Sequence, residues 1–136
     1  MHNRYAAIVA AALAAWIFGA VWYGLLGRAW MAAQGMGEAE IEARRKVRQM
    51  PLRPMAVSFV CELVMALIFS WLLAGLGVAD LAMGALTGLL VGAGFMVTAT
   101  VTNNVFPGRK LMLSVIDGAH WVAVAVIECL ILVALS

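Results

Sequence analysis

The sequence predicts an all-α integral membrane protein, a four-helix bundle formed by a single domain over residues 1–136. Hydrophobic residues make up 65% of the chain and charged residues 12%, against about 45–50% and about 25% in globular domains. A soluble domain of this size could not bury so much apolar surface, because small domains bury the smallest fraction of their surface. The net charge of +2 is too small to indicate a nucleic-acid partner, so the expected surroundings are the lipid bilayer.

Four apolar stretches reach the length of about 20 residues that a transmembrane helix needs. They cover approximately residues 5–26, 55–76, 81–102 and 111–135. The first and third contain no charged residue, whereas the second carries Glu62 and the fourth carries Asp117, His120 and Glu128. None shows the alternating pattern of a membrane strand, so we expect four helices that satisfy their own backbone hydrogen bonds.

Basic residues gather in two of the three loops. The loop at about 27–54 holds six of the nine Lys and Arg residues, and the loop before the fourth helix holds Arg109 and Lys110. Arg4 alone belongs to the opposite side. Because positively charged loops stay in the cytoplasm, we expect a multi-pass chain with both termini outside, N-out/C-out.

The long cytoplasmic loop at 27–54 contains a predicted short helix from about residue 38 to residue 50. Acidic residues lead it and basic residues trail it, which matches the helix dipole. Glu40–Arg44 and Glu42–Lys46 have the favourable i,i+4 order. The basic face of this segment comprises Arg44, Arg45, Lys46 and Arg48. Such a face attracts anionic lipid head groups or, as the simpler interpretation, is solvated and determines topology.

The third apolar stretch carries a row of small residues, Gly84, Gly88 and Gly92. Residues four apart share one face of a helix, so these glycines form a groove that another backbone can approach closely. The pattern predicts tight helix packing, and another helix of this chain is the simplest partner.

Aromatic residues surround the cytoplasmic end of the first stretch. Trp22, Tyr23 and Trp30 are expected to be interface aromatics, because amphipathic rings favour the head-group layer. A cage for a ligand is the alternative interpretation of the same three side chains.

Polar side chains inside the spans are the most informative feature, since an ionisable group there costs at least about 2.5–3.5 kcal/mol on insertion scales. Glu62 and Asp117 each lie about 9–11 Å from the cytoplasmic end of their helices, at 1.5 Å per residue. The depth count adds three further residues to a candidate binding or proton site: Tyr23, Thr98 and His120. Glu128 is expected in the outer half of the membrane, away from this cluster.

The cluster has several possible roles. A structural network that satisfies its own hydrogen bonds is the simplest, and a site that handles protons or cations is the alternative. A metal ion is not expected, because only one histidine is near enough to bind it. No nucleophile motif accompanies the serines, so we expect no catalytic residue, no cofactor and no enzymatic activity.

Three segments resemble a family of small bacterial membrane proteins of unknown function, DUF1761. The run GAVWYGLLGRAW at residues 19–30 is similar to the family's Trp-Tyr pair and its following Gly-(Lys/Arg)-x-Trp. The runs NVFPGRKL at 104–111 and IDGAHW at 116–121 are similar to its C-terminal half. The resemblance implies a four-helix protein of the bacterial inner membrane and names no activity.

Two functions follow as expectations. The first is an accessory or structural subunit of a membrane assembly, with other membrane-protein subunits or further copies of the chain as partners. The second is a small oligomeric transporter or channel for protons, cations or a small solute, which would use the intramembrane acidic and histidine cluster. The substrate, the oligomeric state and the partner are not encoded in any motif of the sequence.

Overall fold

The computed structural model describes residues 3–47 and 50–136, and every regular element within them is a helix. This confirms the all-α prediction. In chain order the elements are α1 (Arg4–Ala33), α2 (Glu38–Val47), α3 (Leu52–Gly75), α4 (Leu81–Val91), η1 (Gly92–Val97), α5 (Thr98–Val105) and α6 (Leu111–Ala134). The described residues contain four helices that are long and apolar enough to cross a membrane, with α4, η1 and α5 forming one of them.

The first helix is longer than its apolar stretch suggested. α1 continues past Leu26 to Ala33, so the first part of the expected loop at 27–54 is helical. The chain then turns at Gly35, whose φ of +93° is open to glycine at little cost. α2 follows and ends at Val47, and residues 48 and 49 lie outside the described part of the chain.

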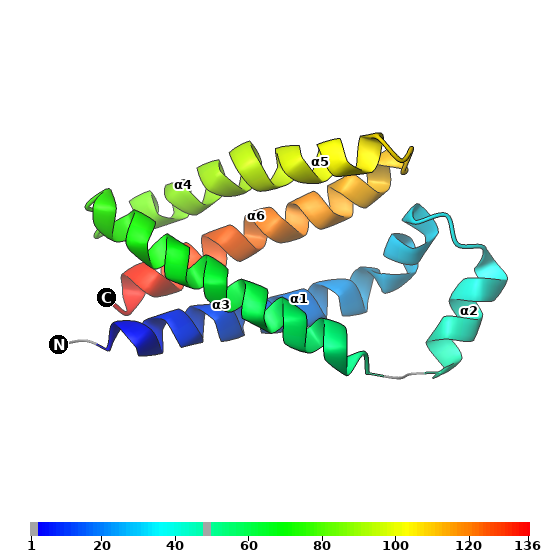
Figure 1. Cartoon of the computed structure of the whole chain (residues 1–136), viewed down its shortest axis with the longest axis horizontal. Coiled ribbons are helices and arrows are strands. Elements are labelled where there is room, and N and C mark those ends of the chain that lie inside the picture. The colour runs from blue at the N-terminus through cyan, green and yellow to red at the C-terminus, as the bar shows by residue number, and fades with distance from the viewer. Residues whose placement is uncertain (1–2, 48–49) are drawn as a thin grey trace.

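α6 is the central helix of the fold, because it packs against α1, α3, α4, η1 and α5. Figure 1 shows α4 and α5 running along one side of α6, α1 along the other, and α3 crossing obliquely. α2 contacts the fold through α1 and lies at the end remote from both termini (Figure 1). The candidate site described below lies among three of these helices, α1, α3 and α6.

The glycine row of α4 lies directly against α6. A Cβ atom at Gly88 would stand 2.6 Å from the carbonyl oxygen of Ala125, and one at Gly92 would stand 2.9 Å from the Cα of Val122. At Gly84 the nearest atom is a side-chain methyl of Val133, at 2.9 Å. At Gly88 and Gly92 the two backbones approach so closely that a side chain would force them apart.

Small residues also fill the core between α1, α3 and α6. The buried residues of this core are Ala7, Ile8, Ala11, Ala12, Ala66, Phe69, Leu73, Ala125, Cys129 and Leu132. Large apolar side chains, by contrast, remain exposed on the outer faces of all four long helices. Small residues inside and large apolar residues outside are typical of a bundle in lipid, where apolar outer surface carries no penalty.

Candidate functional site

The C-terminal half of α1 is attached to the first turns of α6 by hydrogen bonds from three aromatic residues. The Tyr23 hydroxyl donates to Asp117 Oδ1 at 2.6 Å, and Trp30 Nε1 donates to the same oxygen at 3.1 Å. Trp22 Nε1 donates to the Ile116 carbonyl oxygen at 3.2 Å. The polar atoms of these rings are thus bonded within the protein, whereas the sequence suggested that they face the head-group layer.

His120 lies one turn further along α6 and is 5% exposed. Its ring is surrounded by aromatic rings, with centroid distances of 4.7 Å to Trp121 and 5.0 Å to Tyr23. No described residue makes a hydrogen bond to its Nδ1, and none joins it to Asp117. Tyr23 and Trp30, and not His120, supply the donors to Asp117.

Gly19 makes room for this histidine. A Cβ atom at Gly19 would lie 3.0 Å from His120 Nε2, which is tighter than an ordinary contact. The close approach of α1 to α6 at this level therefore depends on the missing side chain.

Glu62 on α3 meets Glu128 on α6. The two side chains are neighbours in the core, and the two residues are 3% and 0% exposed. Among the described residues no donor reaches Glu62 Oε2 or either oxygen of Glu128. Two carboxyl groups in contact in an apolar core cannot both carry a negative charge at low cost.

This pairing differs from the grouping that the sequence suggested. The depth count placed Glu62 beside Asp117 and assigned Glu128 to the outer half of the membrane. That count treats all helices as upright, whereas α3 crosses α6 obliquely (Figure 1), and Glu62 is the neighbour of Glu128. The polar residues of the spans thus form two groups in place of one. The first is Asp117 with Tyr23, Trp30 and the nearby His120, and the second is Glu62 with Glu128.

Thr98 belongs to neither group. Its side chain is exposed, and its hydroxyl donates to the carbonyl oxygens of Gly94 and Phe95 at 2.9 and 3.0 Å. These carbonyls belong to η1, where the wider π-helical turn disturbs the regular hydrogen bonds. The Thr98 hydroxyl is therefore satisfied within its own helix.

A cleft of about 740 Å³ connects the two groups, between α1, the beginning of α3 and α6. Six side chains give it its chemical character: Trp16, Tyr23, Trp30, Glu62, His120 and Trp121. Trp16 is held in place because its Nε1 donates to the Met55 carbonyl oxygen at 3.0 Å and to Ser58 Oγ at 3.1 Å. No Lys or Arg of the described residues lines the cleft.

The α1 wall of this cleft could have been found from the sequence. Trp16, Tyr23 and Trp30 are seven residues apart, so they share one face of the helix, with Gly19 and Gly27 between them on the same face. A row of aromatic residues separated by small ones predicts a concave helix face. The contributions of Glu62 and Trp121 depend on how α3 and α6 are placed around that face.

The basic segment of α2 is held differently from the expected i,i+4 pattern. Arg44 pairs with Glu40 at 3.3 Å as expected, but Glu42 pairs with Arg28 of α1, where Lys46 was expected. Arg28 also approaches Glu38 at 3.7 Å. Arg48, the last member of the predicted basic face, lies outside the described residues.

The cysteines and the remaining acidic residues form no further site. Cys61 and Cys129 are both free thiols. Within residues 3–47 and 50–136 no three His, Cys, Asp or Glu side chains are placed to bind one metal ion.

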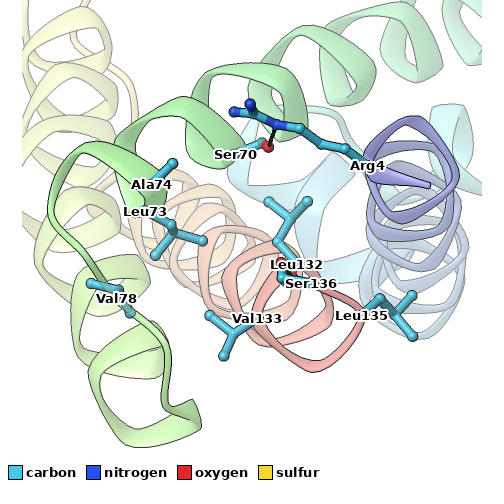
Figure 2. Close-up of a pocket in the computed structure, with 9 residues that line it drawn as sticks. All are labelled: Arg4, Ser70, Leu73, Ala74, Val78, Leu132, Val133, Leu135 and Ser136. Atoms are coloured by element: carbon cyan, nitrogen blue, oxygen red, sulfur yellow. Dashed lines mark hydrogen bonds between the residues drawn. The ribbon is translucent and has the colours of Figure 1, made fainter. Parts of the chain in front are cut away.

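A second hollow of about 300 Å³ lies at the end of the fold where both chain termini lie (Figure 2). Arg4 Nε donates to Ser70 Oγ at 2.8 Å across its rim, and Leu73 and Leu132 contribute to its apolar wall. Arg4 is exposed to the surroundings. No buried polar atom of the described residues faces this hollow without a partner, so the larger cleft is the stronger candidate site.

Four apolar helices of membrane-spanning length, with buried acidic groups between them, define a multi-pass membrane protein. The family model of DUF1761, described as a protein of unknown function, matches residues 6–133. The chain belongs to this family, as its motifs indicated. No functionally curated protein and no solved structure is significantly similar to it.

Proposed function

We propose that this protein is a small proton-conducting transporter or channel of the bacterial inner membrane, and that the Glu62–Glu128 pair carries the proton. The main observation is a pair of neighbouring, nearly inaccessible carboxyl groups, one of which lines an open cleft. Ionisable side chains inside spans are expensive to insert, and they mark proton relays in many pumps and transporters. Three buried carboxyl oxygens of this pair have no donor among the described residues other than a proton held between the two groups, so the pair is not part of a hydrogen-bonded structural network.

The pair has the chemistry that proton transfer requires. Two carboxyl groups in contact in an apolar setting share a proton, and either oxygen can pass it on when the balance between them changes. Glu62 connects this pair to the cleft, and His120 lines the same cleft with an unbonded nitrogen. Histidine exchanges protons near neutral pH, so it provides a second station on the way to water.

The accessory-subunit function has less support. The glycine row of Gly84, Gly88 and Gly92, a face on which another subunit could pack, is occupied by α6 of the same chain. Large apolar residues are exposed on the outer faces of the described helices. The proposal includes further copies of the chain or other subunits as partners. It also places α2 in the cytoplasm, because the basic residues lie in the loops on that side.

Proton flux into proteoliposomes tests the function. Purified protein would be reconstituted with a pH-sensitive dye inside, and a potassium gradient with valinomycin would supply the driving potential. We expect dye-reported proton uptake that falls at least ten-fold in Glu62→Gln and Glu128→Gln, because an amide holds no exchangeable acidic proton. Glu40→Gln on exposed α2 is the matched control and retains the flux. Wild-type uptake equal to that of protein-free liposomes would refute the proposal.

A further inference from the structure

We infer that the cleft between α1, α3 and α6 binds a small amphipathic amine, a molecule with an aromatic or aliphatic body and one protonated nitrogen. The inference rests on the proposed function only in that both use Glu62. Its support comes from the shape of the cleft, from its aromatic walls and from the unbonded acceptors that line it.

The volume and the walls suit an organic molecule. At about 740 Å³ the cleft falls within the range of about 300–1,000 Å³ that is usual for small-molecule sites. Trp16, Tyr23, Trp30 and Trp121 bring aromatic rings from both sides, with Pro51 and Met55 of the α3 end beside them. Aromatic faces attract organic cations as well as apolar bodies.

The polar atoms in the cleft select for a positive charge. Glu62 and His120 both line it, both are more than nine-tenths buried, and Glu62 Oε2 and His120 Nδ1 have no hydrogen-bond partner among the described residues. An ammonium group has only donors and can satisfy a carboxylate oxygen and an imidazole nitrogen together. It would also satisfy two buried groups that otherwise remain without a partner.

Charge complementarity points in the same direction. No Lys or Arg of the described chain lines the cleft, so a carboxylate at Glu62 would have no cation of the protein in the cleft to balance it. An uncompensated charge in an apolar core is costly, so a bound cation is favoured. A carboxylate or phosphate ligand would add a second negative charge, and a lipid acyl chain would leave Glu62 without a role.

Binding in detergent solution tests the inference with two probes that differ only in the charged group. Isothermal titration of the purified full chain with 1-naphthylmethylamine and with 1-naphthylmethanol, each corrected by titration into empty micelles, compares an amine with its neutral counterpart. We expect the amine to bind at least ten-fold more tightly than the alcohol. In Glu62→Gln that preference disappears, because the amide carries no charge.

A second pair of variants covers the case in which Glu62→Gln does not fold. Gly27 lines the cleft and Gly24 does not, and a Cβ atom at either position meets nothing within 4 Å. Gly27→Phe should fill the cleft and abolish amine binding, whereas Gly24→Phe should leave it unchanged. Equal affinity for both probes in the wild type, or unchanged binding in Gly27→Phe, would overturn the inference.

The two proposals can fail separately. The titration measures equilibrium binding and needs no transport, so amine binding without proton flux would remove only the proton-conducting function. Proton flux that requires Glu62, combined with equal affinity for the two probes, would remove only the amine site.

Discussion

Replacement of Gly88 by alanine tests how closely α4 and α6 approach each other. A Cβ atom there would lie 2.6 Å from the Ala125 carbonyl oxygen and 2.8 Å from the Cα of Val126. Ordinary contacts begin at 3.4 Å, so α4 must move away from α6 by about 0.8 Å to accept one methyl group. Both neighbours are backbone atoms of a helix, and neither can rotate out of the way.

The expected loss follows from two opposing effects. Overpacking of a tight interface costs about 1–3 kcal/mol, and the upper end applies here because the backbone itself must shift. Alanine in place of a helical glycine stabilises the helix by about 1 kcal/mol. The net effect of Gly88→Ala is a loss of about 2 kcal/mol in the free energy of unfolding. Gly24→Ala on α1, where a Cβ atom meets nothing within 4 Å, should be neutral or stabilising by up to about 1 kcal/mol.

Equilibrium unfolding in mixed micelles measures this difference. Increasing fractions of sodium dodecyl sulfate in dodecyl maltoside unfold the helices reversibly, and tryptophan fluorescence reports the folded fraction of each variant. A Gly88→Ala protein as stable as Gly24→Ala would contradict the close approach of α4 to α6. The packing described for the glycine row would then be wrong.

Three further predictions concern α1, α2 and the orientation. Tyr23→Phe removes a donor from Asp117 and should lower stability by about 1–3 kcal/mol, measured by the same unfolding titration; no change would show that the hydrogen bond does not form. Arg28→Gln breaks ion pairs that are solvent-exposed, so it should lower the free energy of unfolding by less than about 1 kcal/mol in the same titration. A larger loss would mean that more than these ion pairs holds α2 to α1. A cysteine at Glu40 should react with a membrane-impermeant maleimide only in inside-out vesicles, and a cysteine at Ser136 only in spheroplasts; the reverse pattern would overturn the N-out/C-out orientation.

The sequence determined the class of fold by itself. Apolar runs of about 20 residues specify membrane helices through length and composition, which are local properties. Each of the four expected spans accordingly corresponds to a helix between Arg4 and Ala134. The same local logic located α2, because acidic residues at its beginning and basic residues at its end are read within a single helix.

The candidate site could be predicted only in part. Counting residues along each helix correctly grouped Tyr23 with Asp117. It does not give the tilt of one helix against another, and the depth of a residue depends on that tilt. Glu62 was therefore assigned to Asp117 by counting residues, whereas α3 crosses α6 obliquely (Figure 1) and Glu62 is the neighbour of Glu128.

Tertiary structure also decided which groups satisfy Asp117 and which are left without partners. The ring nitrogen of Trp30 reaches Asp117 because α1 continues as a helix beyond its apolar stretch, and local composition gave no reason for that extension. The positions of the two buried carboxyl groups and of the unbonded nitrogen of His120 likewise depend on how the helices pack. A sequence specifies the ionisable groups and the faces they occupy, but the distances between them are set by packing, here by glycine and alanine residues that let α6 approach α1, α3 and α4 at once.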